Sequence, residues 1–167
     1  GINVVLVGPL PTPALTLLSK SLRADFSVMI TASHNPFFDN GLKFFSNQGY
    51  KISAEDENKI EDYFFNYDFD NFKIKHSNYG KAVRLNDAMG RYSEALKRSA
   101  DRDLDYSKIK VTLDCANGAA YKVAPEVLFE MGVDLHTIAD KPSGTNINDR
   151  CGSVSYTHLT LPTTSKV

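Results

Sequence analysis

Two short apolar runs, separated by a helix-like stripe, most constrain the fold of this chain. The runs are Val4–Val7 and Phe26–Ile30, and both are continuous rather than alternating. Continuous runs of this length are typical of parallel strands that are covered on both faces. Between them, Leu15, Leu18 and Leu22 repeat at helical spacing. Strand, helix and strand predict a right-handed βαβ unit with the two strands paired in parallel.

The helix of this unit has a recognisable start. Gly8–Pro11 stops the first strand, Thr12 is the expected cap, and Pro13 suits the first helical position. Substrate contact by this segment is the alternative. We favour the structural interpretation, because each of these residue types is typical of a helix start.

The polar loop after the second apolar run carries the candidate chemistry. Ser33 supplies a hydroxyl, His34 a titratable ring and Asn35 an amide, while Lys43 follows ten residues after the serine. The carboxyl ends of strands are where open α/β sheets bind their ligands. Residues 39–41 (Asp-Asn-Gly) predict a turn that returns the chain toward the loop. The Ser33 hydroxyl, the His34 ring and the Lys43 ammonium group would then lie close enough together to surround one phosphate group.

The neighbouring Ser33 and His34 would not by themselves indicate catalysis. A catalytic base normally approaches a serine hydroxyl from across the fold, so adjacent residues more often form a polar turn. A serine hydrolase is also disfavoured, because no Gly-x-Ser-x-Gly elbow precedes the helix. Only the whole stretch together with Lys43 favours a chemical role.

The chain after this loop predicts a hairpin and a capped helix. Residues 41–45 and 49–52 flank Ser-Asn-Gln at 46–48, and Ser53 then precedes three acids at 55–57. Acids in a first turn complement the positive end of the helix dipole. We favour that interpretation of the acidic cluster over a metal site.

The next segment leads to a second helix. Residues 66–80 lack periodicity and predict a variable connection, in which His76 is interpreted as a surface histidine rather than a ligand. Asn86 is the expected cap of a core-facing helix, and residues 100–108 are charged and typical of a domain boundary. The helical stripe consists of Leu85, Ala88, Met89, Tyr92, Leu96 and Ser99.

A second βαβ unit follows this boundary. Ile109–Leu113 predicts a strand, residues 114–120 a turn into a helix that reaches about Met131, and Val133–Ile138 the next strand. Gly132 is expected to end the helix. The helix start could attract an anion. We favour a tight turn that allows close packing of strand and helix.

Charge and cysteine content exclude several classes of function. The net charge of −1 gives no electrostatic basis for binding nucleic acid or an anionic membrane, and no apolar run reaches membrane-spanning length. Cys115 and Cys151 make no disulfide framework and suit a reducing cytoplasm. Cys115 is interpreted as a buried small hydrophobe rather than a low-pKa thiol.

Three polar stretches together resemble the α-D-phosphohexomutases. They are Thr31–Pro36 with 39–45, Asp114–Ala120, and Pro142–Asn148 with Cys151–Ser153. Their order and character are those of that family. The third stretch, Gly-x-Asn-Ile-Asn followed by Cys-Gly-Ser, favours the branch that acts on glucosamine phosphates over the phosphomannomutase branch. The resemblance covers Gly1 to Ser153 and is weakest at 66–80.

The resemblance implies an isomerase that works by phosphoryl transfer. Phosphorylated Ser33 would give its phosphoryl group to a hexosamine phosphate, the bisphosphate would reorient, and the other phosphoryl group would return to Ser33. Glucosamine 6-phosphate and glucosamine 1-phosphate would interconvert, in the supply of cell-wall amino sugars. Lys43 would bind substrate and act as acid, base or charge stabiliser. His34 would support proton transfer or orient the loop, and Asn35 would hold the loop or contact phosphate.

The family resemblance also implies Mg²⁺ and a longer protein. The phosphate on Ser33 would be one metal ligand, and the acidic ligands would lie beyond this chain. The chain alone is therefore expected to be inactive. A cytoplasmic location is expected, and the family is compatible with a homo-oligomer. The alternatives are a phosphomannomutase or phosphoglucomutase of the same family, and a non-catalytic module that binds sugar phosphates.

The expected architecture is three-layer α/β/α with a mixed sheet, in parts of two phosphohexomutase-type domains. Residues 1–100 would belong to the first domain, with the phosphoserine loop, and residues 101–153 would begin the second. Residues 154–167 do not resemble the family and contain six Ser or Thr and no acid. They are interpreted as a foreign tail that packs against nothing specific.

Overall fold

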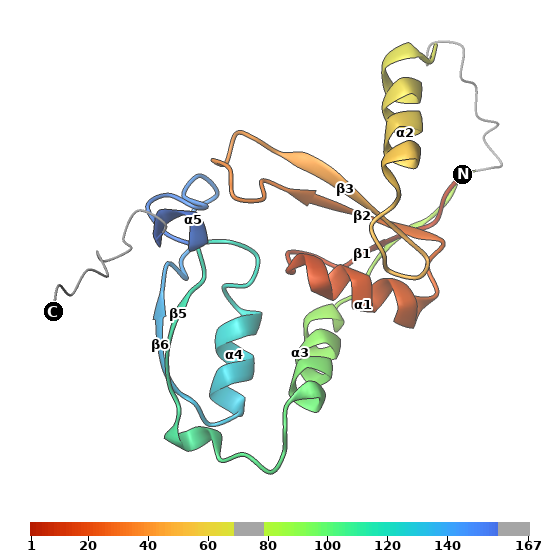
Figure 1. Ribbon diagram of the computed structural model, residues 1–167. Helices are drawn as coiled ribbons and strands as arrows, with labels where there is room; N and C mark the ends of the chain where they lie inside the picture. Colours follow the sequence, from red (N-terminus) through yellow and green to blue (C-terminus); the bar gives the residue numbers. More distant parts are fainter. Residues whose placement is uncertain (69–78, 157–167) are drawn as a thin grey trace, which may run out of the picture. The chain divides into compact units, whose positions relative to one another are not determined.

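The computed structural model describes residues 1–68 and 79–156. The chain forms two compact units (Figure 1). The first consists of Gly1–Met29 and Lys43–Met89, and the second of Ile30–Leu42 and Gly90–Val167. His76 and the part of the predicted tail after Tyr156 lie outside the described residues.

The strand β1 (Val4–Leu6) pairs in parallel with β4 (Ala82–Arg84), and Val5 faces Val83. The predicted parallel pairing of β1 with the strand at Phe26–Ile30 is therefore wrong, because these two strands belong to different sheets within the described residues. The predicted burial of β1 is also wrong, because its side chains are 43 to 45% exposed. The apolar run correctly indicates a strand, but the residues of β1 and β4 are exposed rather than buried on both faces.

The strand β2 (Phe26–Thr31) forms a two-stranded sheet with β3 (Gly41–Ser46), which follows it along the chain. The connection at 32–40 is too short for the crossover that parallel neighbours need, so the pair is a hairpin rather than part of a βαβ unit. Phe26, Val28 and Ile30 are all exposed. The prediction of a parallel strand buried on both faces is therefore wrong for β2 as well.

The helix α1 (Thr12–Leu22) provides the core of the first unit. Leu15 and Leu18 are buried, as the stripe predicted, together with Ala14 and Ser19. The N-cap is Pro11 rather than Thr12, and no side chain caps the helix. The backbone carbonyl of Pro11 instead accepts from the amide of Ala14 at 2.9 Å.

The helix α1 packs against β2 and the turn after β3. The hydroxyls of Ser19 and Ser27 lie 2.6 Å apart. A Cβ at Gly49 would lie 2.8 Å from the backbone oxygen of Thr16, and the φ of Gly49 is +72°. Only glycine fits both conditions. The amide of Gly49 donates to Ser46, and Phe45 bridges to Lys51, which confirms the predicted hairpin turn.

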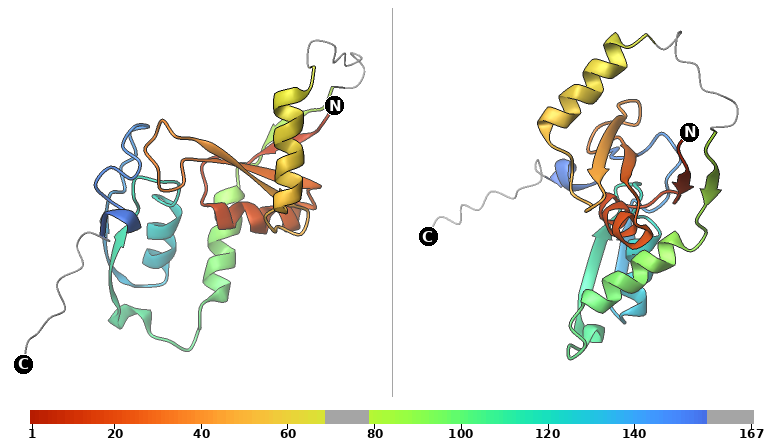
Figure 2. Two further views of the ribbon diagram at one scale, coloured as in Figure 1. Left: turned by 45° about the horizontal axis from the view of Figure 1, so that its top comes forward. Right: turned by 90° about the vertical axis from the view of Figure 1, so that its right-hand side faces the viewer.

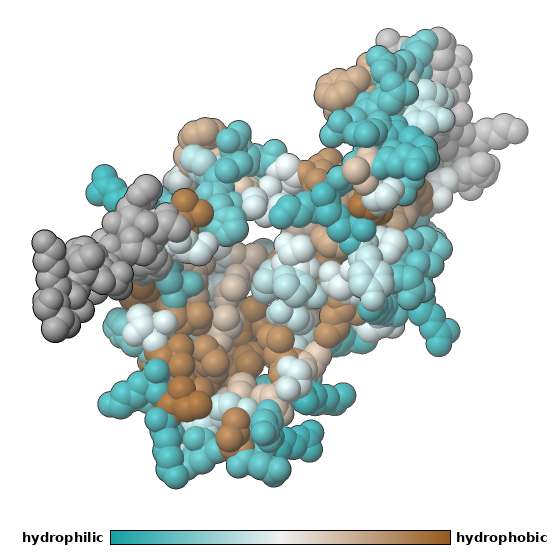
Figure 3. All heavy atoms as spheres, in the orientation of Figure 1, coloured by the Kyte–Doolittle hydropathy of each residue, from teal (hydrophilic) through white to brown (hydrophobic). Residues whose placement is uncertain are grey.

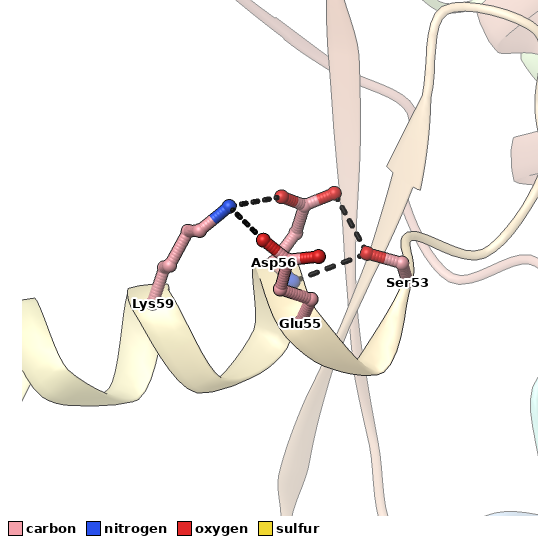
Figure 4. A network of polar contacts seen from close by, with 4 residues as sticks. All are labelled: Ser53, Glu55, Asp56 and Lys59. Carbon is pink, nitrogen blue, oxygen red and sulfur yellow. Dashed lines mark hydrogen bonds and ion pairs between the residues drawn. The ribbon is translucent and has the colours of Figure 1, made fainter.

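The helix α2 (Ala54–Asn66) starts as the sequence predicted. Ser53 is the N-cap, and its hydroxyl oxygen accepts from the amide of Asp56 at 3.1 Å (Figure 4). Lys59 pairs with Glu55 at 2.8 Å and with Asp56 at 3.5 Å. These contacts raise the pKa of Lys59, with the Glu55 hydrogen bond as the largest cause. None of the helix is buried, and teal side chains dominate its visible face in Figure 3.

The helix α3 (Ala88–Ser99) follows β4, and its stripe is partly buried as expected. Ala88, Tyr92 and Ser93 are buried, and burial raises the pKa of Tyr92. The one-turn 3-10 helix at Tyr106–Lys108 then leads into the second βαβ unit.

The second βαβ unit forms as predicted. The strands β5 (Lys110–Asp114) and β6 (Asp134–Ile138) pair in parallel along their whole length, with Lys110 facing Asp134. The helix α4 (Val123–Glu130) lies between them in sequence and ends at Glu130, with Met131 as its C-cap. Gly132, the expected end, lies two residues further on, and its amide donates to Phe129 at 2.9 Å. Val123, Val127 and Val133 are buried. Figure 3 shows apolar side chains gathered over β5 and α4.

The end of the described chain is a single helical turn, α5 (Ser153–Tyr156). It includes the first three residues of the predicted tail, and the amide of Ser155 donates to the carbonyl of Gly152 at 3.1 Å. Among the helices of residues 1–68 and 79–156, none is long and apolar enough to cross a membrane.

Candidate functional site

The serine loop, residues 32–40, is built from two consecutive turns that carry polar side chains into solvent. The amide of Asn35 donates to Ala32 at 2.9 Å, and the amide of Asp39 donates to Pro36 at 3.0 Å. Ala32 is buried and anchors the loop, whereas the residues after it are exposed. The turn expected at 39–41 thus lies three residues earlier, and Gly41 already belongs to β3.

Ser33 has a left-handed backbone with φ +54°, a conformation that residues other than glycine rarely adopt. The conformation costs about 1–2 kcal/mol and persists only where neighbouring contacts stabilise it. One such contact is local, because the amide of Ser33 donates to the Thr31 hydroxyl at 2.9 Å. It uses the backbone of Ser33 and does not engage the serine hydroxyl.

The second contact that fixes the serine loop comes from Asn148. Its side-chain nitrogen Nδ2 donates to the carbonyl of Ser33 at 3.0 Å and to that of Asn35 at 2.9 Å. Sequence reasoning did not assign a role to Asn148. The available signal was the Gly-x-Asn-Ile-Asn motif itself, since no local spacing connects residues this far apart in the chain.

The position of Asn148 depends on the turn after β5. The carboxylate of Asp114 accepts from the amide of Ala116 at 2.8 Å and from the amide of Gly152 at 2.7 Å. The amide of Asn148 donates to the carbonyl of Ala116 at 2.9 Å. Figure 1 and the left view of Figure 2 show the loop between β2 and β3 beside the blue segment that precedes α5.

Asn117 links the same turn to the start of the 141–152 segment. Its Nδ2 donates to the carbonyl of Asn146 at 3.2 Å, and its Oδ1 accepts from the amide of Lys141 at 3.1 Å. The turn predicted for tight strand–helix packing therefore also organises a distant loop. Two of the three stretches that carry the family resemblance meet here, and Asn148 connects them to the third.

The structure brings Ser33, His34 and Asn35 together on one exposed loop of the second unit. Lys43 lies in the first unit, at the third position of β3, where it is half-buried. Phe45, two residues further along β3, is the buried residue of that strand.

Metal binding is not supported by the described residues alone. Within residues 1–68 and 79–156, no group of three or more His, Cys, Asp or Glu side chains is arranged to hold an ion. The acids at the start of α2 contact Ser53 and Lys59 instead. A magnesium ion needs several oxygen ligands, and the described residues alone do not provide them.

The two cysteines are free thiols with no sign of activation. Burial is the largest cause that raises the pKa of Cys115, and the nearby Asp140 and Asp114 add to it. Burial and Asp114 also raise the pKa of Cys151. The interpretation of Cys115 as a buried small hydrophobe is confirmed.

Comparison with known proteins agrees with the resemblance. A family model described as phosphoglucomutase/phosphomannomutase, alpha/beta/alpha domain I, matches residues 1–71. A phosphoglucosamine mutase of Geotalea uraniireducens is 51% identical over 154 residues, which is 92% of this chain and 34% of that protein. The chain therefore spans about a third of the length of such curated relatives.

Two solved structures show the same fold. A protein from Thermus thermophilus described as a phosphomannomutase has a TM-score of 0.69 and 27% identity, over 87% of this chain and 32% of that one. The N-acetylphosphoglucosamine mutase of Aspergillus fumigatus, solved with GlcNAc-6P and magnesium, has a TM-score of 0.60 and 18% identity, over 93% and 43% of the two chains. The expected α/β class with mixed strand directions is confirmed. Residues 1–71 therefore match the first domain of the phosphoglucomutase/phosphomannomutase family, and the chain as a whole is similar to a segment of the phosphoglucosamine mutases.

Proposed function

We propose that the protein to which this segment belongs interconverts glucosamine 6-phosphate and glucosamine 1-phosphate through a phosphoserine at Ser33. The observation that carries the proposal is the serine loop. Ser33 is exposed, and its left-handed backbone is fixed from two sides, by Thr31 and by Asn148. Both contacts use backbone atoms, so a hydroxyl on a fixed backbone is presented to solvent. The similarity to phosphoglucosamine mutases supports the choice of substrate.

The proposed reaction consists of two phosphoryl transfers. In the first, a sugar hydroxyl oxygen attacks phosphorus and loses its proton to a base, while the bond between Ser33 Oγ and phosphorus breaks and Oγ takes up a proton. The product is a hexosamine bisphosphate. After this intermediate reorients, Ser33 Oγ loses its proton and attacks the other phosphoryl group, and the released sugar oxygen takes up a proton. Positioning and charge stabilisation supply most of the catalysis in such transfers.

Three further residues complete the proposed site. The ammonium group of Lys43 would stabilise the charge on the transferring phosphoryl group, bind the substrate phosphate, or exchange the proton of the sugar hydroxyl. His34 would assist that proton transfer or orient the loop. Asn35 would hold the loop or contact phosphate, and its carbonyl already takes part in the contact with Asn148.

The proposal extends to parts of the protein that this chain does not describe. Residues 1–100 would belong to a first domain and residues 101–153 to a second, in a cytoplasmic protein. Magnesium would be held by the phosphate on Ser33 together with acids outside the described residues. Because the chain spans only 34% of its relatives, we propose that it is inactive alone.

Substitutions in the full-length protein test the proposal. Ser33→Ala should abolish conversion of glucosamine 6-phosphate, assayed with Mg²⁺ and a bisphosphate primer. Lys43→Ala should lower the rate by about 10²-fold or more, the scale of a lost acid or base. Ser53→Ala is the matched control, because it removes a hydroxyl that caps α2, and it should keep full activity.

The results of these assays distinguish the proposed mechanism from another substrate and from a non-catalytic module. Full activity in Ser33→Ala would overturn the phosphoserine mechanism. Activity confined to glucose or mannose phosphates would overturn the substrate but keep the mechanism. Binding of sugar phosphate without any turnover by the wild-type protein would favour a non-catalytic module.

A further inference from the structure

We infer that Asn148 is a positioning residue for phosphoryl transfer, which holds the backbone of the serine loop from the second βαβ unit. The inference rests on the proposed function of Ser33. Asn148 contacts the two carbonyls that flank His34, at 3.0 Å and 2.9 Å, and these contacts leave the serine hydroxyl unengaged. It therefore acts on the reaction through the orientation of Ser33.

The chemistry of the contact suits asparagine. The side-chain amide carries two N–H donors, and the carbonyls of Ser33 and Asn35 offer one acceptor each. Asn148 itself has a left-handed backbone with φ +59°, which asparagine tolerates better than most residues.

The backbone of Asn148 is held by the structure around β5. Its amide donates to Ala116, while Asp114 at the end of β5 accepts from Gly152 on the other side of the loop. A Cβ on Gly152 would lie 2.9 Å from the Cβ of Ala116, and the φ of Gly152 is +80°, so only glycine fits. Cys115, between Asp114 and Ala116 in sequence, is buried. The contact to the serine loop therefore originates from a packed part of the unit.

The consequence concerns the rate constant rather than substrate affinity. A phosphorylated Ser33 must present its phosphorus in line with the attacking oxygen, and small errors in position cost large factors in rate. The left-handed Ser33 needs outside contacts to persist. Losing the two hydrogen bonds of Asn148 leaves the local contacts of the loop, from the Ser33 amide to Thr31 and from the Asn35 amide to Ala32, among the described residues. We therefore expect kcat to fall while KM changes little.

The test compares three variants of the full-length protein. Asn148→Gly deletes the amide and keeps a residue that accepts positive φ, so that backbone strain does not confuse the result. Asn148→Asp keeps the shape but places carboxylate oxygens against two carbonyls. Asn146→Ala is the matched control, because the side chain of Asn146 bonds within its own loop, to Ser143 and Lys141.

Two readouts are measured on each variant. Hydrogen exchange without substrate reports on the amides of Ser33, Asn35 and Asp39, and steady-state kinetics gives kcat and KM. Both Asn148 variants should speed exchange at these amides by about tenfold, the scale of two lost hydrogen bonds. They should lower kcat by about 10- to 100-fold with KM within about threefold. Asn146→Ala should leave exchange in the serine loop near the wild-type rate.

Any of three results would overturn the inference. The first is unchanged exchange in the serine loop of both Asn148 variants, and the second is an equal change in Asn146→Ala. The third is a loss of affinity with kcat unchanged, since that pattern indicates substrate binding. An inactive wild-type protein whose loop still loosens in Asn148→Gly would instead reject the proposed function and keep the structural contact.

Discussion

The pairs β5–β6 and β1–β4 have the same parallel geometry but very different burial. The first is matched along five residues on each strand and lies with α4, whose Val123 is only 2% exposed. The second is three residues long, and Val83 in it is 55% exposed. The strand β1 is a continuous apolar run, whereas polar residues interrupt β5 and β6, yet β1 is the more exposed strand. The difference teaches that an apolar run specifies a strand, whereas the burial of that strand depends on which elements pack against it.

The largest expected effect tests this difference directly. Val123→Ala should lower the free energy of unfolding by about 2 kcal/mol, because it removes buried methyl groups and leaves a cavity. Val83→Ala, the same change in β4, should alter it by less than about 0.5 kcal/mol, as exposed substitutions do. Urea unfolding followed by circular dichroism measures both. Equal losses would mean that β4 is covered to the same degree as α4.

A smaller effect concerns α2, which is stabilised locally rather than by burial. Ser53→Ala should destabilise the protein by about 1 kcal/mol, whereas Ser53→Gly should cost only a few tenths, because glycine is a tolerated cap. The helical circular dichroism signal and the midpoint of thermal unfolding report the change. An identical loss in the two variants would show that the Ser53 hydroxyl bond to Asp56 is not what starts the helix.

The smallest effect is the pH dependence contributed by the thiols. The pKa values of Cys115 and Cys151 are raised, so the folded protein keeps protons that the unfolded chain has already lost. Their contribution to stability is fully present below the ordinary thiol pKa of about 8.5 and is lost as pH rises from there through the raised pKa values of the folded protein.

Alkylation followed by mass spectrometry measures these thiols. Cys151 should react faster than Cys115, because Cys115 is buried and Cys151 only half-buried. Both rates should reach their midpoint above the pH of a free thiol. Rapid alkylation of Cys115 at neutral pH would contradict the burial of the turn after β5.

Local features of the fold were predictable from sequence, and distant pairings were not. The Ser53 cap, the α1 stripe and the β5–α4–β6 unit each depend on residues close in the chain, and all three predictions are confirmed. The pairing of Val5 with Val83 depends on contacts between segments far apart. No periodicity within one segment specifies such a partner, which is why the predicted pairing of the first two strands is wrong.

In the candidate site, too, local features were predictable from sequence and distant contacts were not. The serine loop was identified from its residue types and its place after a strand, and Ser33 does lie exposed on it. The left-handed backbone of Ser33 and the two bonds from Asn148 were not predicted. Both come from tertiary contacts rather than from local preference. The roles of Ser33, His34, Asn35 and Lys43 stay predictions.

The most direct test of the account is the transfer of a labelled phosphoryl group. The dephosphorylated full-length protein would be incubated with ³²P-labelled hexosamine 1,6-bisphosphate and Mg²⁺, and the labelled residue identified by peptide mass spectrometry. The account predicts label on Ser33, its loss in Ser33→Ala, and its retention in Ser53→Ala. Label on another residue, or undiminished labelling of the Ser33→Ala protein, would contradict the assignment of Ser33 as the phosphoryl carrier.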